Sequence, residues 1–252
     1  METELTNRIL NEDALEGISK IPDCSLDLVV PKLKATGSLY IFLTWRYSPE
    51  IFCYLKKKLI MLNEIIWDRR VPSMGGSTRR FSSVHDTIGF FAKTKEHYFD
   101  IDSIRVPYDE ETKKARSRSI FVGKKWLEVG YNPKDVWSIS RLHAIHSERE
   151  DHPTQKPLEI VERMIKASCP ANGMVLDPFM GSGTTAVAAH RLKRNFIGFE
   201  INSDYCAMIR QRLHDEGAFK LEMPVQAPES AKSKLKRAQP SLFEHAMAVK
   251  HA

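Results

Sequence analysis

The chain places an acid and two glycines directly after a short apolar run, in the stretch Val-Leu-Asp-Pro-Phe-Met-Gly-Ser-Gly-Thr-Thr at residues 175–185. Gly181 and Gly183 allow the backbone to approach a bound molecule closely. A second apolar run, at residues 196–199, ends in Glu200. Ligands of open α/β sheets bind where such strands end, and an acid there typically accepts hydrogen bonds from ribose hydroxyls. These residues therefore predict a site for a nucleoside-containing cofactor.

The glycine spacing narrows the class of cofactor. A dinucleotide site requires G-x-G-x-x-G, and a phosphate-binding loop requires G-x-x-x-x-G-K-[ST]. Neither pattern is present, and the turn carries Asp177 instead of cationic side chains. An acid suits a cofactor with a cationic amino acid end better than it suits a pyrophosphate. On these residues alone, a glycine-rich turn in an ordinary βαβ unit remains the alternative, because a fold does not determine a function.

A second short stretch, His-Pro-Thr-Gln-Lys-Pro at residues 152–157, lies about twenty residues upstream of Asp177. With it, residues 177–185 resemble the S-adenosylmethionine motif of DNA amino-methyltransferases, in the permuted β group of adenine-N6 and cytosine-N4 enzymes. The similarity extends from Ile9 to Leu213. The resemblance implies a Rossmann-like α/β fold with a doubly wound, mostly parallel, seven-stranded sheet in permuted strand order.

The same resemblance implies S-adenosylmethionine as the cofactor and double-stranded DNA as the partner. The reaction would move a methyl group to the exocyclic amine of a flipped base. Adenine N6 is the favoured target and cytosine N4 is the alternative. The family includes the modification enzymes of restriction systems as well as enzymes without a restriction partner.

Apolar runs and turn residues predict the elements that must position these residues. The expected strands are Arg8–Leu10, Leu26–Val30, Ser38–Leu43, Glu64–Trp67, Thr87–Ala92, Met174–Leu176 and Phe196–Phe199. The expected helices are Ala14–Ile21, Pro49–Leu59, Pro157–Ser168, Ala186–Leu192 and Tyr205–Leu213. We expect residues 1–223 to form one domain with a DNA-recognition insertion at about 68–150, and residues 224–252 to form a flexible basic tail.

Composition bounds the functional class. The net charge of +6 and the pI of about 9.1 favour a polyanionic partner. The four cysteines lack C-x-x-C spacing, so we expect reduced thiols and no metal site. The sequence shows neither a signal peptide nor an apolar run of about 18 residues, which predicts a cytoplasmic protein without a membrane partner.

The resemblance assigns roles at the cofactor site. Asp177 would face the methionine amino group, Glu200 would bind the ribose hydroxyls, and Asp13 would contact the adenine amino group. The full set of predicted cofactor-binding residues is Asp13, Thr154, Lys156, Asp177, Phe179, Gly181, Ser182, Gly183, Thr184, Glu200 and Asn202. Two alternatives remain open, since Asp13 could instead cap the helix at Ala14 and Lys156 could be a solvated surface charge.

Two basic clusters in the middle of the chain predict the DNA-binding face. Their members are Arg69, Arg70, Arg79, Arg80, Lys113, Lys114, Arg116 and Arg118. Arginine suits phosphate and guanine contacts because its guanidinium donates bidentate hydrogen bonds. For any single residue a solvated loop charge is the alternative. The acidic and apolar stretch Ile101–Tyr108 resembles a connector of these enzymes and predicts a possible homodimer.

No catalytic residue can be named. Enzymes of this family hold the target amine with an Asp-or-Ser-Pro-Pro-aromatic tetrapeptide, which should follow Val30. The chain instead continues with Pro-Lys-Leu-Lys at residues 31–34. A non-catalytic relative that binds DNA or cofactor is therefore the second functional class.

The spacing of two strands offers another explanation of this absence. Leu26–Val30 and Ser38–Leu43 are both expected as parallel strands of one sheet, and only residues 31–37 lie between them. Parallel neighbours need a crossover of about a dozen residues or more. We therefore expect that a segment of the native protein, with the catalytic loop, is missing from this sequence between Val30 and Pro31.

Overall fold

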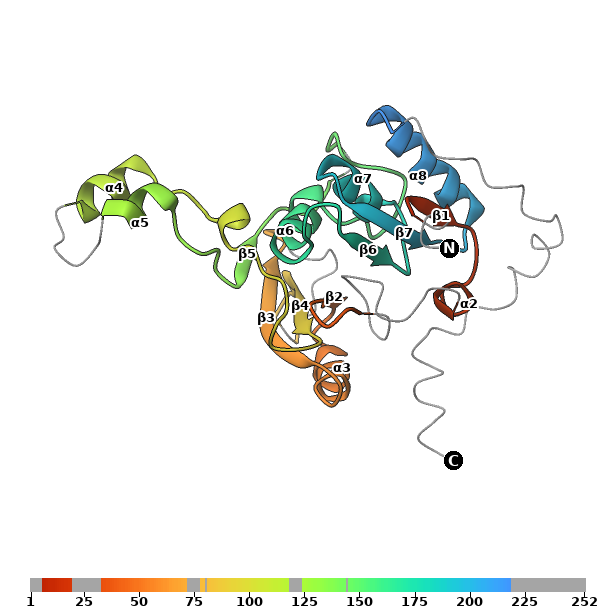
Figure 1. Cartoon of the computed structure of the whole chain (residues 1–252), viewed down its shortest axis with the longest axis horizontal. Coiled ribbons are helices and arrows are strands. Elements are labelled where there is room, and N and C mark those ends of the chain that lie inside the picture. Colours follow the sequence, from red (N-terminus) through yellow and green to blue (C-terminus); the bar gives the residue numbers. More distant parts are fainter. Residues whose placement is uncertain are drawn as a thin grey trace. The chain divides into compact units, whose positions relative to one another are not determined.

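The computed structural model describes residues 6–19, 33–71, 78–79, 81–117, 124–143 and 145–218, and of 124–126 only the backbone (Figure 1). Four sequence predictions lie outside these residues: the strand Leu26–Val30, the junction at Val30–Pro31, the side chains of Arg80 and Arg118, and the tail 224–252. Within the described ranges, no helix combines the length and apolar character needed to cross a bilayer.

The first sheet is parallel and contains β1 (Arg8–Leu10), β7 (Asn195–Phe199) and β6 (Met174–Asp177), in the order β1-β7-β6. Ile9 pairs with Gly198, and Leu176 pairs with Ile197. The helices in this part of the chain are α2 (Ala14–Ser19), α6 (Leu158–Ser168), α7 (Thr184–Arg191) and α8 (Ser203–Asp215). Their apolar faces bury Val175, Val187, Ile209 and neighbouring side chains in one cluster.

The second sheet is mixed and contains β2 (Ser38–Leu43), β4 (His85–Ala92), β3 (Ile60–Asp68) and β5 (Val136–Ser138), in the order β2-β4-β3-β5. β4 is antiparallel to both β2 and β3, whereas β5 is parallel to β3. The predicted pairing of Glu64–Trp67 with Thr87–Ala92 is confirmed, with both strands longer than expected. Helix α3 (Ser48–Leu55) packs Phe52 against Phe91 of β4.

The prediction of one mostly parallel seven-stranded sheet needs correction for the described residues. Their strands form two sheets, and the described partner of β2 is the antiparallel β4. The physical reason is that β3 and β4 form a hairpin, which needs no crossover, so β4 returns antiparallel between β2 and β3. The strands β6 and β2 end their respective sheets, and the residues predicted to form a strand next to them, Leu26–Val30, lie outside the described part.

Several helix boundaries differ from the predicted ones. α3 ends at Leu55 instead of Leu59, because Lys57 and Leu59 donate to the carbonyls of Tyr54 and Leu55 in a turn that leads into β3. Pro157 is the N-cap of α6 and not its first helical residue. Helix α8 extends from Ser203 to Asp215, beyond the predicted Tyr205–Leu213.

The middle of the chain carries short elements: the 3-10 helix η1 (Asp102–Ile104), α4 (Glu110–Arg116) and α5 (Lys124–Val129). Asp109 caps α4 by accepting from the backbone N–H of Thr112 at 2.7 Å. An isolated antiparallel bridge joins Val106 to Tyr131. This bridge holds together the two chain segments that lead to α4 and away from α5.

Candidate cofactor site

A cavity of about 490 Å³ lies along β2 and β6, the strands at which the two sheets end. Its walls come from the glycine turn after β6, from residues 152–156, from α6 and from β2. Seven of the eleven predicted cofactor residues line it: Thr154, Lys156, Asp177, Phe179, Gly181, Ser182 and Thr184. The structure therefore brings the two sequence motifs together around one cavity.

The turn after β6 requires glycine at two positions. Gly181 has φ +51° and Gly183 has φ +77°, both in the left-handed region. A Cβ at Gly181 would lie 2.8 Å from Nε2 of His152, and a Cβ at Gly183 would lie 2.6 Å from Cγ2 of Ile209. The first glycine thus lets the turn touch the upstream motif, and the second lets it pack on α8.

Glu200 is held at the end of β7 by backbone donors. Its Oε2 accepts from the N–H of Gly181 at 2.8 Å, and its Oε1 accepts from the N–H of Asn202 at 2.8 Å. These two hydrogen bonds fix the carboxylate against the glycine turn. Because each carboxylate oxygen can accept more than one hydrogen bond, Glu200 retains acceptor capacity for ligand hydroxyls.

Asp177 ends β6 and lines the cavity. Its Oδ1 accepts from the N–H of Phe179 at 3.0 Å, and its Oδ2 accepts from the hydroxyl of Thr185 at 2.6 Å. Burial raises the pKa of the Asp177 carboxyl, and the hydrogen bonds from Thr185 and Phe179 oppose this shift. A cationic group of a ligand would stabilise the charged carboxylate at this position.

His152 and Lys156 come from the upstream motif. The His152 ring contacts that of Tyr205 edge to face with a centroid distance of 4.6 Å. Burial lowers the pKa of His152, although nearby Glu200 raises it. The ammonium of Lys156 lies 5.1 Å from the ring centroid of Phe42 and 5.3 Å from that of Trp67.

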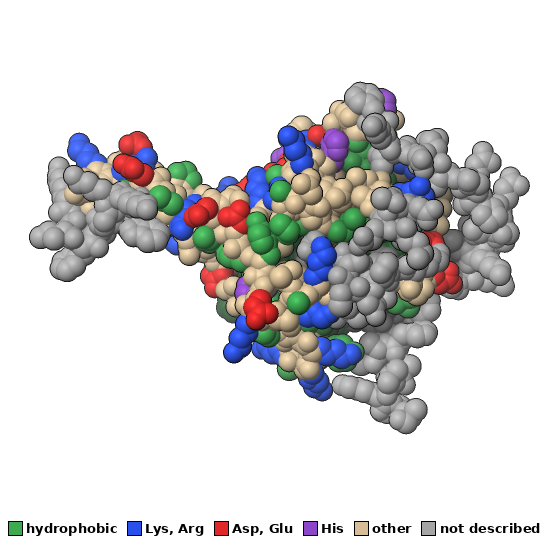
Figure 2. Space-filling view, viewed as in Figure 1, with side chains coloured by type: hydrophobic (Ala, Val, Ile, Leu, Met, Phe, Trp, Pro, Cys, Tyr) green, Lys and Arg blue, Asp and Glu red, His purple; other side chains and the backbone are tan. Residues whose placement is uncertain are grey.

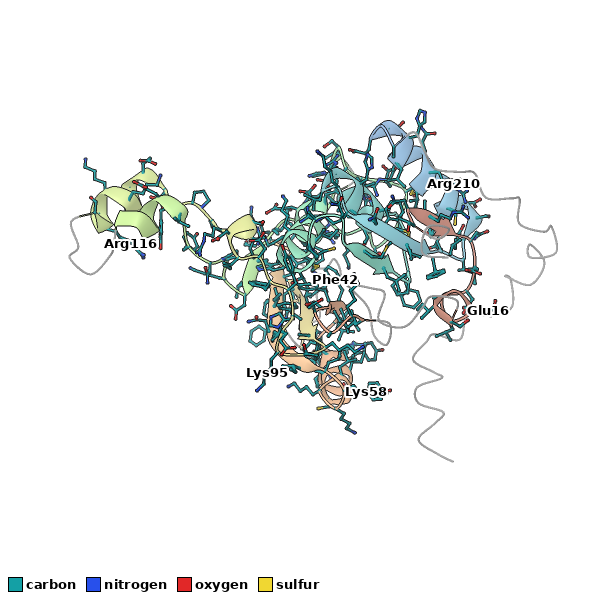
Figure 3. The ribbon with its side chains drawn as sticks, in the orientation of Figure 1. Glu16, Phe42, Lys58, Lys95, Arg116 and Arg210 are labelled. Carbon is teal, nitrogen blue, oxygen red and sulfur yellow. The ribbon has the colours of Figure 1, made fainter. Side chains whose placement is uncertain are left out.

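Lys156 connects the two sheets. Its backbone carbonyl accepts from the hydroxyl of Thr184, next to the glycine turn, at 3.1 Å. Its side chain reaches Phe42 and Trp67, near the carboxyl ends of β2 and β3 (Figure 3). Burial lowers the pKa of Lys156, which argues against the alternative of a solvated surface charge.

Other predicted residues already have structural roles. Asp13 caps α2 by accepting from the N–H of Leu15 at 2.8 Å, as its alternative interpretation expected. Asn202 caps α8 by accepting from the N–H of Asp204 at 2.8 Å. The prediction that Thr184 and Thr185 cap α7 is wrong, because Gly183 is the N-cap and the two hydroxyls donate to Lys156 and Asp177. Asp13, Gly183, Glu200 and Asn202 do not line the cavity.

Sequence reasoning missed Arg212. Its guanidinium donates to the carbonyl of Ser182 at 2.5 Å and forms an ion pair with Glu150 at 3.2 Å, while its side chain is only 9% exposed. The pattern could have revealed it, since Arg212 lies on the α8 face that buries Ile209 and Leu213. A buried arginine on an apolar helix face needs partners, and here they are the glycine turn and the segment before His152.

The predicted DNA-contact residues are divided. The Arg69 guanidinium donates to the carbonyl of Ser83 at 3.2 Å and lies 3.7 Å from Asp86, while that of Arg70 donates to the carbonyl of Ser138 at 2.6 Å. Both arginines therefore contribute to the fold at the carboxyl end of β3. Arg79 is exposed.

The second basic cluster lies on α4. Lys113 forms an ion pair with Glu110 at 2.6 Å, and Arg116 lies 5.1 Å from the ring centroid of Tyr108. Lys114 is exposed. Figure 2 shows acidic as well as basic side chains around α4, since Glu110 and Glu111 occupy its first turn. The surface of α4 therefore carries both signs of charge.

Comparison with known proteins gives a family. A model described as "DNA methylase", of the N6 and N4 methyltransferases, matches residues 9–211. The chain is 42% identical over 196 residues to the type II methyltransferase M1.MboII of Moraxella bovis, which covers 71% of this chain and 73% of the relative. It is 35% identical over 187 residues to the DNA adenine methyltransferase YhdJ of Escherichia coli K12, covering 72% of this chain and 62% of the relative.

A solved structure shows the same fold. The crystal structure of the M1.HpyAVI–SAM complex matches with a TM-score of 0.61 and 24% identity, covering 82% of this chain and 98% of the other. The chain is also 32% identical to the type II methyltransferase M.BglII of Bacillus subtilis, covering 83% of this chain and 69% of the relative. That alignment runs over 261 positions, more than the 252 residues of this chain, so M.BglII has internal residues for which this chain has no counterpart.

Proposed function

This chain belongs to the N6/N4 DNA methylase family, and we propose that it transfers a methyl group from S-adenosylmethionine to adenine N6 of DNA. The carrying observation is the glycine turn between β6 and α7, whose Gly181 N–H binds Glu200 and whose Asp177 faces the cavity. Membership in the family supports the coarser activity, a DNA amino-methyltransferase. The choice of adenine and the assignment of site residues are the proposal.

The residues at the cavity fit S-adenosylmethionine. The partly buried Asp177 carboxylate would bind the cationic amino group of the methionine portion. Glu200, already oriented by two backbone N–H groups, would accept from the ribose hydroxyls. The absent Cβ of Gly181 leaves the turn open to close approach, and Phe179, Ser182 and Thr184 would complete the wall around it. The bound cofactor would supply the activated methyl group.

Adenine is favoured over cytosine by one relative. YhdJ, whose name gives adenine as its target, is 35% identical to this chain. The family model includes N4 as well as N6 enzymes, so cytosine N4 is the second candidate. The type II methyltransferases among the relatives support a role in a restriction-modification system.

A non-catalytic relative is the competing class. The chain has no Asp-Pro-Pro-Tyr or Ser-Pro-Pro-Tyr sequence, which favours this class if Val30 and Pro31 are adjacent in the native protein. The longer alignment with M.BglII is consistent with a missing internal segment, which favours the enzyme. Intact mass spectrometry of the protein from its natural source separates the two, because a missing segment gives a mass above 28.9 kDa.

Activity and target base are tested together. Genomic DNA is incubated with the native protein and S-adenosylmethionine carrying a labelled methyl group, then digested to nucleosides. We expect label in N6-methyladenine. Label in N4-methylcytosine would leave the family activity intact and contradict the adenine assignment. No label, with cofactor binding retained, would favour the non-catalytic class.

We further propose that double-stranded DNA binds at the exposed basic residues Arg79, Lys113, Lys114 and Arg116, and that Arg69 and Arg70 shape the same face. The stretch Ile101–Tyr108 remains our proposed surface for a homodimer. Light scattering at micromolar concentration tests the dimer. A mass of 28.9 kDa for the native chain, the monomer value, would contradict it.

A further inference from the structure

The carboxyl ends of the strands face one side of this part of the molecule. β6 ends at Asp177, β2 at Leu43 and β3 at Asp68, and Lys156 joins them by lining the cavity while reaching Phe42 and Trp67. We call this side the carboxyl edge. Because β4 is antiparallel, its first residue, His85, also lies there, opposite Asp68. Ligands of α/β sheets bind at this edge.

Exposed aromatic side chains gather at the carboxyl edge. Trp45 is 51% exposed and Tyr47 is 43% exposed, and both directly follow β2. Phe81 is 99% exposed and precedes β4, while Phe179 is 64% exposed and follows β6. Among the described residues, only two other aromatic side chains are exposed, Tyr54 and Phe99. Four of six exposed aromatics therefore follow or precede strands at one edge, whereas scattered surface residues would show no such preference.

A cation accompanies these rings. The Arg46 guanidinium lies 5.6 Å from the ring centroid of Trp45. Rings that alternate with cations are the surface that unpaired bases prefer, because the rings stack on the bases and the cations neutralise phosphates. A duplex with complete base pairs hides the faces of its bases and gains little from such rings.

The order of strands places these aromatics next to the cavity. β2 ends the second sheet beside the cavity, and β4 separates it from β3 and its arginines. The segment Trp45–Tyr47 therefore lies between the cavity and the face proposed to hold DNA. A base that leaves the duplex for the cavity must pass this segment.

We propose that Trp45, Tyr47 and Phe81 form a stacking surface for unpaired bases of DNA, with Arg46 as a phosphate contact. This proposal rests on the proposed function and adds residues that neither basic cluster contains. The ligand class is single-stranded or locally unpaired DNA. Stacking tolerates any base, since every base has a π face.

The test measures binding of two fluorescent probes, a mixed-sequence single strand and the duplex of equal length, without cofactor and at fixed salt. The variants are Trp45→Ala, Phe81→Ala and Trp45→Phe. The matched control is Tyr54→Ala, because Tyr54 is 56% exposed but lies near the end of α3, close to Lys58. Phe42 and Lys58 lie at opposite ends of the second sheet (Figure 3).

We expect each alanine variant at Trp45 or Phe81 to bind the single strand roughly ten-fold more weakly, as for the loss of one stacked base. Trp45→Phe and Tyr54→Ala should bind like the wild type, and duplex binding should change less than single-strand binding. Unchanged single-strand binding of both alanine variants, or an equal loss in Tyr54→Ala, overturns the stacking surface. A wild type that binds only the duplex also overturns it, while a wild type that binds neither probe overturns the DNA partner itself.

Discussion

The carboxylate of Glu200 accepts a hydrogen bond from the backbone N–H of Gly181, with 2.8 Å between Oε2 and nitrogen. This bond joins the acid at the end of β7 to the glycine turn after β6. It gives Glu200 one orientation before any ligand binds. Because ordering a side chain on binding costs conformational entropy, a prearranged acceptor binds its ligand more tightly.

Replacing Glu200 by alanine should weaken the binding of S-adenosylmethionine by about 1–3 kcal/mol, because a charged acceptor is lost. Glu200→Gln should lose less, since its amide oxygen can still accept from one backbone N–H. Titration calorimetry measures both. Asp204→Ala, which removes an exposed acid from the first turn of α8, is the control and should bind normally. Unchanged affinity in Glu200→Ala would remove Glu200 from the site.

Asp177→Asn should stabilise the unliganded protein while it weakens cofactor binding. The folded-state pKa of Asp177 is raised above 3.8 by burial, so its contribution to stability is present below the unfolded pKa and is lost as pH rises through the folded pKa. At neutral pH the charged carboxylate therefore opposes folding, and asparagine removes that charge. We expect a higher Tm together with a loss of about 1.5–3 kcal/mol in cofactor affinity. A lower Tm would contradict the sign.

The pH dependence of stability should include a contribution from His152. Burial lowers its folded-state pKa below 6.5, so the unfolded chain takes up a proton before the folded protein does. Stability should therefore fall as pH drops below 6.5, in addition to the loss caused by other groups. The difference in Tm between pH 7.5 and pH 5.5 should be smaller in His152→Gln than in the wild type (about these two pH values the ordinary histidine titrates). Equal differences would exclude His152 as the group.

Arg212→Met should destabilise the protein by about 2 kcal/mol, because it leaves the carbonyl of Ser182 and the carboxylate of Glu150 without their partner. The lower end of the usual range applies, since Glu150 remains 34% exposed. Chemical denaturation measures the change. Arg210→Met removes a cation from the same helix (Figure 3) and should cost much less. Similar losses in both variants would mean that helix charge, and not the link to the turn, is responsible.

Arg79→Ala should weaken binding to duplex DNA and should lower the slope of log affinity against log salt by about one, as for one lost phosphate contact. Cofactor affinity should not change. Lys95→Ala is the control, because Lys95 is an exposed cation next to the opposite end of β4. A loss of cofactor affinity in Arg79→Ala would indicate a disturbed fold and not a DNA contact.

The sequence predicted best where local pattern and tertiary position agree. The apolar runs of β6 and β7 and the glycines at 181 and 183 predicted the turn, because only a few residue types can occupy those positions. The apolar stripe of α6 likewise predicted its helix. Boundaries were less certain, as for α3, whose apolar pattern continues through Leu59 although the chain already turns at Lys56.

The contacts of polar side chains could not be predicted from the sequence. Arg69 and Arg70 were predicted on the DNA face from their charge, but hydrogen bonds to Ser83 and Ser138 decide their positions, and these partners lie 14 and 68 residues away. Lys156 over Phe42 and Trp67 is a similar case. Such pairings depend on which strands meet, and the separation of the described strands into two sheets was not foreseen.

The pairing of β1 with β7 also determines the order in which the chain can fold. Asn11, next to β1, donates to the backbone carbonyl of Glu200, 189 residues further along the chain. During synthesis the first strand therefore has to wait until almost the entire described chain has left the ribosome. The β3–β4 hairpin closes between neighbouring segments and can form much earlier. Because closing a long loop costs entropy before any contact repays it, β1 should be the last strand to join its sheet.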